Sequence, residues 1–286
     1  YEAVEQGINT TDEIAEQCNI EIELHRNLMP HIKIPKEFKN EQEYLKHLTN
    51  VGWKKRGLHK LPPEKKKIYK ERLRNEFEVL NYLGYCSYFI MLSQLINKIK
   101  ERNIPLGYSR GSGANSLTLY VLGVTQIDSI RWDLDFSRFA NKGRLGSAAD
   151  YDIDISKARR QEVLEIAAEL FGEEMIAQVA TYNSLSPKVC IRDLGKVFDE
   201  EGIYKIPYSL SPDDPNGKMT IEKALESSEE LQRYQEQFPL LFEYTKYIQN
   251  LPKSIGCHAA AVIIAPTPVT DYAPLMYNKN GNLMMQ

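Results

Sequence analysis

Three aspartates stand at every second position in the stretch "DYDIDIS" at residues 150–156. On a β-strand, alternate residues share one face, so the three carboxylates would crowd together. Such carboxylates repel one another unless a cation lies between them. The residues concerned are Asp150, Asp152 and Asp154, with Tyr151, Ile153 and Ile155 expected to pack into the core.

Two carboxylates about 7 Å apart along a strand can converge on hard cations such as Mg²⁺. A pair of such ions roughly 3.5–4 Å apart supports phosphoryl transfer. The motif therefore predicts a metal site. The alternative is the charged, exposed face of an edge strand, which discourages pairing with another chain.

A glycine-rich loop, "SRGSGANS" at 109–116, could bind an anion. Gly111 and Gly113 permit backbone angles that other residues avoid, and we expect the loop to open a helix near Ala114. The groups expected to bind phosphate are the loop N–H groups, the Ser112 and Ser116 hydroxyls and the Arg110 guanidinium. The spacing fits neither a Walker A loop nor the dinucleotide fingerprint, so a plain tight turn remains the alternative.

Basic residues at helical spacing occur in "PKVCIRDLGK" at 187–196. Lys188, Arg192 and Lys196 would form a stripe on one helix face, for which a solvated surface is the alternative. His258, between a glycine and an apolar run, is expected to be a structural residue rather than a ligand or base.

Helices and strands must position these groups. We expect the acidic strand at 150–155 to lead into a helix that Ser156 caps and Gly172 ends. The glycine-rich loop should connect a short strand to a helix within 103–124. Further helices are expected at 9–22 (N-cap Thr10 or Thr11), 41–59, 64–82 and 85–102, with a break at Gly84. Strands are expected at 175–182 and, buried, at 257–266, followed by a hairpin at 275–286 that turns at Asn280-Gly281.

Composition excludes some classes of protein. The chain has 286 residues, 42% of them hydrophobic, so it can form substantial cores and is not extensively disordered. Apolar runs such as 259–266 are too short to span a bilayer. The four scattered cysteines suggest neither a disulfide framework nor a CxxC site, and we expect a cytoplasmic protein without membrane partners. The net charge of −3 gives no general sign of nucleic-acid binding, and the basic run at 54–74 is weak evidence for it.

Four motifs in order resemble one known family. They are "GYSRGSGANSLTLYVLGVTQID", "ADYDIDISKARRQEV", "PKVCIRDLGKVF" and "SIGCHAAAVIIAPTPVTDYAPL". Together they resemble the palm and thumb of the bacterial C-family replicative DNA polymerases, the DNA polymerase III alpha subunits. The segment "NTTDEIAEQCNIEI" is similar to the exit from the family's N-terminal PHP domain.

The resemblance implies roles for particular residues. Asp152 and Asp154 match two catalytic aspartates that bind two Mg²⁺ ions, whereas Asp150 matches a preceding acid that is not a ligand. Residues expected to bind the nucleotide or its phosphates are Arg110, Gly111, Ser112, Lys188 and Arg192. The implied partners are primer–template DNA, a dNTP and, through regions outside this chain, replisome subunits such as the sliding clamp.

The implied fold is α+β, with a nucleotidyltransferase-β-type palm that has a mixed sheet and flanking helices, plus an inserted helical thumb. The expected domains are 1–183 (first part of the palm, with linker helices from the PHP exit), 184–256 (thumb) and 257–286 (second part of the palm).

The sequence departs from the family pattern at Ala149, Ile155, Asn115 and Ser137, and "RLGSAAD" is one residue longer than usual. These departures indicate a divergent branch, with a phage-encoded one as an alternative. We also expect the chain to be a fragment, nearly inactive alone, whose third catalytic aspartate follows residue 286. The predicted function is template-directed DNA synthesis. The alternatives are a non-catalytic DNA-binding remnant and a template-independent nucleotidyltransferase.

Overall fold

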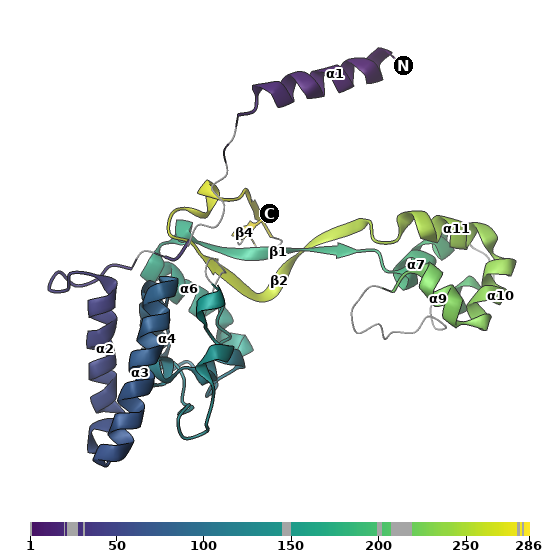
Figure 1. Ribbon diagram of the computed structural model, residues 1–286. Helices are drawn as coiled ribbons and strands as arrows, with labels where there is room; N and C mark the ends of the chain where they lie inside the picture. Colours follow the sequence, from purple (N-terminus) through teal and green to yellow (C-terminus); the bar gives the residue numbers. More distant parts are fainter. Residues whose placement is uncertain are drawn as a thin grey trace. The chain divides into compact units, whose positions relative to one another are not determined.

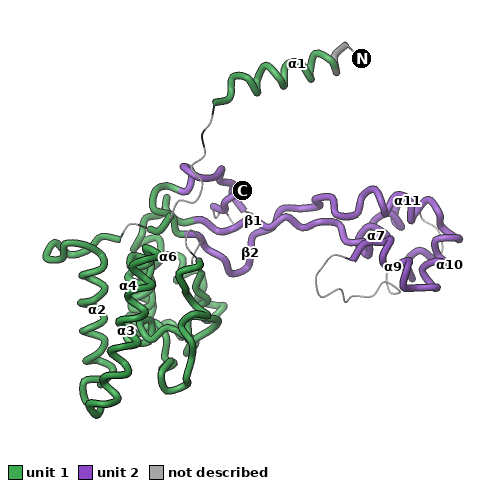
Figure 2. Tube along the Cα trace, in the orientation of Figure 1, with its two compact units in different colours: residues 1–176, 264–268 green, residues 177–263, 269–286 purple. Residues whose placement is uncertain are grey.

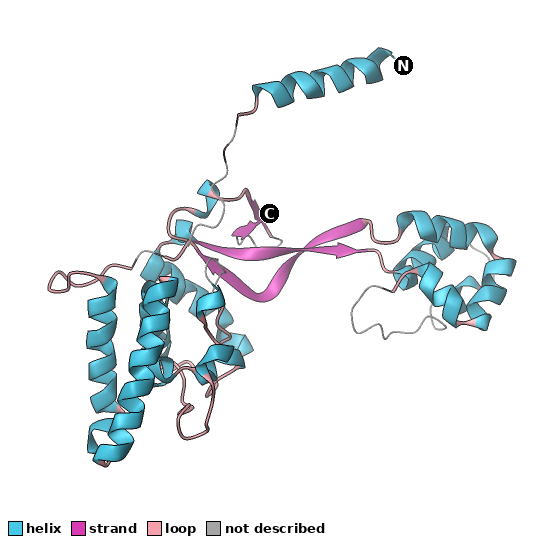
Figure 3. Ribbon diagram, in the orientation of Figure 1, coloured by secondary structure: helices cyan, strands magenta, loops and turns pink. Residues whose placement is uncertain are grey.

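The computed structural model describes the chain apart from residues 1, 20, 22–27, 31, 145–149, 199–201, 207–218, 279, 280 and 282. Helices dominate, and the strands form one four-stranded sheet (Figure 1, Figure 3). The expected α+β class is confirmed. The chain divides into two compact units, residues 1–176 with 264–268 and residues 177–263 with 269–286 (Figure 2).

The first unit is helical. Its helices are α1 (Glu2–Gln17), α2 (Glu41–Lys55), α3 (Pro63–Leu83), α4 (Cys86–Glu101), α5 (Leu117–Val121) and α6 (Arg160–Phe171). Short 3-10 turns lie at Leu58–Lys60, Gly111–Asn115, Phe136–Arg138, Lys142–Arg144, Lys157–Arg159 and Glu173–Met175.

Helix α4 forms the centre of the main core because it is apolar around most of its circumference. Its buried residues include Phe89, Leu92, Leu95, Ile96 and Ile99. Helices α2 and α6 both pack against α4. The long helices thus form the support on which the loops of this unit rest.

The predicted break between α3 and α4 is also confirmed. Gly84 has a left-handed backbone (φ +70°), and the Tyr85 N–H closes the end of α3 on the Leu80 carbonyl at 2.9 Å. Among the described residues, no single helix meets the length and hydropathy expected of a membrane span. Helices α3 and α4, bent by 111°, do so only as a pair.

Helix α1 corrects one prediction. The helix runs through Thr10 and Thr11, so neither is its N-cap. Their hydroxyls instead donate to the Gln6 and Gly7 carbonyls, both at 2.9 Å, within the helix. This bonding to the residue four positions earlier is the alternative open to a threonine hydroxyl.

The second unit contains most of the sheet, whose order is β2-β1-β4-β3. The strands are β1 (Ile176–Ser184), β2 (Pro252–Ile264), β3 (Leu275–Tyr277) and β4 (Leu283–Met285). Strand β4 is parallel to β1 and antiparallel to β3, so the predicted mixed sheet is confirmed. The predicted hairpin at 275–286 is also confirmed, although Asn280 lies outside the described residues.

Strand β2 differs from the prediction of a buried strand at 257–266. It begins earlier, at Pro252, and residues 258–260 are exposed. Its apolar run is therefore buried only in part, mainly towards its end.

The segment expected to be a thumb contains α7 (Pro187–Phe198), α9 (Ile221–Ser227), α10 (Glu229–Gln237) and α11 (Pro239–Ile248). These helices share a core separate from that of α4, formed by residues that include Ile191, Ile203, Ile221 and Phe242. The helical character is as predicted. The domain boundaries at 183 and 256 remain predictions.

Candidate active site

The three aspartates lie on an extended segment rather than on the predicted strand. Residues 150–154 have no regular secondary structure, and Ile155 forms a single antiparallel bridge with Leu106. The Gly107 N–H donates to the Asp154 carbonyl at 2.9 Å. The prediction of a regular strand is wrong, because in the described structure only this short contact pairs the segment with a neighbour.

The predicted alternation of side chains is nevertheless confirmed. All three aspartates are exposed, whereas Tyr151 and Ile153 pack against the main core. Extended backbone alone produces this alternation, whether or not a ladder of hydrogen bonds forms. The carboxylates therefore share a solvent-facing side, as a cation site requires.

The glycine-rich loop packs directly on this acidic segment. A Cβ atom on Gly111, which has a φ of +61°, would lie 2.8 Å from Asp152 Oδ2. A Cβ atom on Gly113 would lie 2.2 Å from the Tyr151 ring. Real Cβ atoms do not approach neighbours so closely, so any side chain at these positions would force the loop away from the aspartates. Because Gly111 and Gly113 have no side chains, the loop can pack directly against the acidic segment.

Arg110 provides the positive charge at this contact. Its Nη1 donates to Asp154 Oδ1 at 3.0 Å, with 63% of the arginine side chain and 49% of the aspartate side chain exposed. The hydrogen bond and charge of Asp154, together with the charge of Asp152, raise the pKa of Arg110 above its ordinary value. An exposed pair of this kind adds little to stability and can exchange partners readily.

Phenols form the underside of the acidic segment. Burial raises the pKa of Tyr88 far above its ordinary value, and Asp150, Tyr151, Tyr85 and Asp152 add to that shift in decreasing order. Burial, and then the Asp152 charge, raise the pKa of Tyr151 to about 12. Both phenols are therefore neutral at pH 7 and add no charge beside the aspartates.

The helix after the loop begins later than predicted. A 3-10 turn covers Gly111–Asn115, and α5 begins at Leu117 with Ser116 as its N-cap. The Ser116 hydroxyl and the Leu117 and Thr118 N–H groups all donate to the buried Glu76 carboxylate of α3. These donors are therefore engaged within the protein, and the candidates in the loop for a phosphate contact include Arg110, Gly111 and Ser112.

Glu76 was missed by sequence reasoning, although it had left a signal. On α3 the buried positions are Tyr69, Glu76, Leu80 and Leu83, so Glu76 lies in register with apolar residues. A carboxylate on the apolar face of a helix indicates a buried partner.

Lys188 and Arg192 lie on α7 of the second unit, separate from the unit that contains the aspartates. Both side chains are exposed, as is Lys196, which forms an ion pair with Asp193 at 3.3 Å. The predicted basic stripe exists on α7, whereas its part in phosphate binding remains a prediction.

His258 has the structural role that was predicted. Its Nδ1 accepts hydrogen bonds from the Ala260 and Ala261 N–H groups at 3.2 and 2.8 Å. The ring thus secures the local backbone of β2.

Asp152 and Asp154 are suitable ligands for Mg²⁺. They supply hard oxygen donors, and Mg²⁺ is commonly held by one or two carboxylates with water and substrate phosphates completing the coordination. No cluster of three or more histidine, cysteine or acidic side chains suited to a metal occurs in the described part of the chain. The two carboxylates have the donor chemistry that Mg²⁺ prefers, and their role as ligands remains a prediction.

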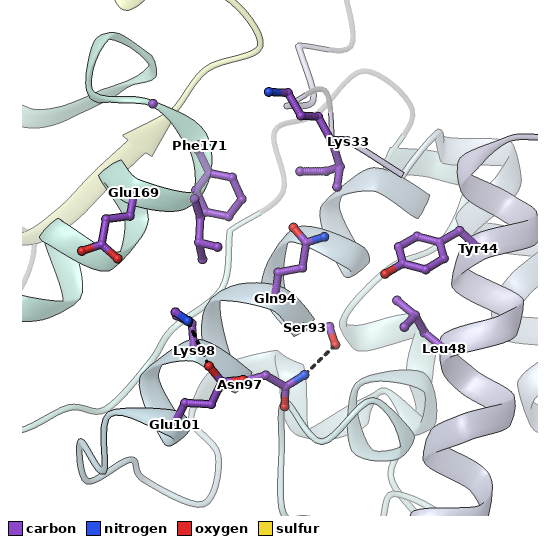
Figure 4. Close-up of a pocket in the computed structure, with 13 residues that line it drawn as sticks. Lys33, Tyr44, Leu48, Ser93, Gln94, Asn97, Lys98, Glu101, Glu169 and Phe171 are labelled. Carbon is purple, nitrogen blue, oxygen red and sulfur yellow. Dashed lines mark hydrogen bonds and ion pairs between the residues drawn. The ribbon is translucent and has the colours of Figure 1, made fainter. Parts of the chain in front are cut away.

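A separate cavity of about 720 Å³ lies elsewhere in the first unit, lined by residues of α2, α4 and the end of α6 (Figure 4). Tyr44, Ser93 and Glu169 are among its lining residues, and Asn97 donates to Ser93 Oγ at 3.4 Å. Neither the acidic segment nor the glycine-rich loop contributes to its lining. The cavity is distinct from the candidate active site.

Comparison with known proteins identifies the family. The domain family described as "Bacterial DNA polymerase III alpha NTPase domain" matches residues 43–286. The chain belongs to this family. The DNA polymerase III alpha subunit of Treponema pallidum (strain Nichols) is 36% identical over 291 residues, covering 99% of this chain and 24% of the relative. The subunit of Escherichia coli (strain K12) is 32% identical over 287 residues, covering 97% of this chain and 24% of the relative.

The chain thus spans about a quarter of the length of the curated DNA polymerase III alpha subunits that it matches. The matched range includes both the acidic segment and the glycine-rich loop, whereas α1 precedes it. The predicted resemblance to the C-family polymerases is confirmed. The candidate site therefore lies in the part of the chain that defines the family.

Proposed function

We propose that this chain is part of a DNA polymerase that extends a primer on a DNA template. The reaction is nucleotidyl transfer: the primer 3′-hydroxyl attacks the α-phosphate of a dNTP and pyrophosphate leaves. The observation that supports this best is the contact between Gly111 and Asp152, since it brings a candidate phosphate-binding loop directly to a candidate metal ligand.

Asp152 and Asp154 hold two Mg²⁺ ions in this proposal. When bound, such ions lower the pKa of the attacking hydroxyl and stabilise the charge on the leaving oxygens. Arg110 balances the charge of Asp154 in the described structure. Because this pair is exposed, Arg110 would be able to bind a phosphate of the dNTP together with the Gly111 and Ser112 backbone when Asp154 helps to hold the metal.

The second unit contributes to DNA binding. Lys188 and Arg192 on α7 contact phosphates of the primer–template, and the helices α7–α11 act as the thumb. The aspartate-bearing unit and the sheet are the palm of nucleotidyltransferase-β type. Other replisome subunits, including a sliding clamp, bind outside this chain, and the protein works in the cytoplasm.

The test is primer extension by the full-length polymerase that contains this segment, with Mg²⁺ and dNTPs. Asp152→Asn and Asp154→Asn keep the side-chain size but remove the charge. We expect each to lower kcat by about 10²–10³, the usual effect of removing one preorganised electrostatic group.

Asp150→Asn is the matched control, because Asp150 is also exposed on the same segment but is not a proposed ligand. We expect it to stay within about tenfold of the wild type. Full activity of either ligand variant, or an equal loss in all three variants, would contradict the assignment. A wild-type enzyme that adds nucleotides without a template would instead support the template-independent alternative.

A further inference from the structure

The buried carboxylate of Glu76 is the centre of a hydrogen-bond network beneath the glycine-rich loop. Its Oε1 accepts from Arg72 Nε at 2.7 Å and from Leu117 N at 2.9 Å. Its Oε2 accepts from Ser116 Oγ at 3.0 Å, Thr118 N at 2.9 Å and Thr118 Oγ1 at 2.8 Å. Glu76 is 0% exposed. Five donors thus converge on one carboxylate, an arrangement that fixes the backbone at the start of α5 relative to α3.

Arg72 extends the network to Asn115, near the end of the loop. Its Nη2 donates to the carbonyls of Asn115 and Leu134, both at 2.8 Å. Asn115 in turn donates through Nδ2 to the Ser112 carbonyl at 2.8 Å. A continuous chain of hydrogen bonds therefore connects Glu76 to Ser112.

The other end of the loop is attached to the acidic segment. Gly107 N–H bonds to the Asp154 carbonyl, and Leu106 forms a bridge with Ile155. Gly111 and Ser112 lie between two fixed points, one on the acidic segment and one on α3. The separation of the loop from the aspartates therefore depends on both attachments.

We propose that Glu76 is a positioning residue for the dNTP triphosphate, acting through Ser116–Thr118 and through Arg72. This inference rests on the proposed function of the loop. Glu76 does not touch the substrate. It holds the Gly111 and Ser112 backbone in place beside Asp152 and Asp154, so its loss weakens dNTP binding before it affects DNA binding.

Glu76→Gln tests the proposal in the full-length polymerase. The side-chain amide of this variant can adopt two orientations. One turns its NH₂ group towards the Leu117 N–H, and the other turns it towards the Thr118 N–H. In either orientation two donors face each other and one hydrogen bond is lost. We expect KM for the dNTP to rise about tenfold or more, while the Kd for primer–template DNA stays within twofold.

Glu78→Gln is the matched control. Glu78 lies on the same helix but is exposed, and its carboxylate pairs with Lys142 at 2.6 Å. We expect this variant to match the wild type in both KM and kcat. An unchanged KM in Glu76→Gln would overturn the proposal. This includes a variant in which only kcat falls because a smaller fraction of the enzyme is folded.

Thr118→Val provides a second variant in case Glu76→Gln fails to fold. It removes the hydroxyl donor to Glu76 and keeps the charge of Glu76 and the shape of the side chain at position 118. KM for the dNTP should therefore rise, but by less than in Glu76→Gln. An unchanged KM would again count against the proposal.

Amide hydrogen exchange separates this proposal from the proposed function. We expect faster exchange at residues 111–121 in Glu76→Gln than in Glu78→Gln, whether or not the enzyme is active. Equal exchange in the two variants overturns the anchoring role. A wild-type protein that cannot extend a primer refutes the proposed function instead.

Discussion

The two ends of the glycine-rich loop are each connected to an arginine–carboxylate pair, and the two pairs differ in burial. At the end near α5, Glu76 is fully buried and the Arg72 side chain is 21% exposed. At the beginning, Arg110 and Asp154 are both largely exposed. A buried pair with every lone pair engaged fixes the structure, whereas an exposed pair can exchange its partners for substrate or metal. The buried pair therefore holds the loop near α5, whereas the exposed pair at the other end is available for chemistry.

The largest expected difference is in stability. Glu76→Ala leaves Arg72 and the α5 donors without their partner, so the free energy of unfolding of the first unit should fall by about 3–5 kcal/mol. Asp154→Ala should leave it nearly unchanged. Urea denaturation monitored by tryptophan fluorescence measures the free energy of unfolding, because Trp53 and Trp132 both lie in the first unit. Similar losses in the two variants would remove the distinction between the pairs.

The second prediction concerns activity at the exposed end. Arg110→Ala should lower kcat/KM for the dNTP roughly tenfold, since a charge-assisted bond to phosphate is lost, while stability is unaffected. Steady-state primer extension by the full-length enzyme is the measurement. Arg138→Ala, an exposed arginine outside the loop, is the control. The assignment fails if the two variants have the same kcat/KM.

The third prediction tests the close approach between the loop and the acidic segment. Gly111→Ala forces a left-handed alanine and should reduce stability by about 1–2 kcal/mol. Gly57→Ala imposes the same backbone strain (φ +72°) but places its Cβ in open space. Only Gly111→Ala should also lower primer extension, because its Cβ would displace Asp152. Equal activity in the two variants would show that the contact has no functional role.

The smallest effect should be the response to salt. Raising NaCl from about 0.05 to 1 M screens exposed charges strongly and buried ones weakly. Double-mutant cycles on unfolding should therefore give an Arg110–Asp154 coupling that disappears at high salt and an Arg72–Glu76 coupling that persists. Loss of both couplings at 1 M would mean that solvent reaches the Glu76 carboxylate.

The family resemblance implied the α+β class. Local signals in the sequence alone determined the long helices α2–α4, the break at Gly84 and the face shared by the three aspartates. These features follow from local periodicity and from residues with special backbone geometry, which act over a few positions. The family motifs also carried the match to DNA polymerase III alpha. Local signals gave the wrong N-cap at Thr10 and Thr11. A threonine hydroxyl can either cap the start of a helix or donate to a carbonyl four residues earlier inside the helix.

Only the tertiary structure decided what the acidic segment pairs with and what the loop rests on. Residues 150–154 form no ladder, because pairing depends on a neighbouring backbone and not on the alternating pattern. Three partners of Glu76, namely Ser116, Leu117 and Thr118, lie 40–42 residues away along the chain, beyond the reach of any periodicity. The sequence placed the aspartates on one face, and packing between distant segments placed the glycine-rich loop against them.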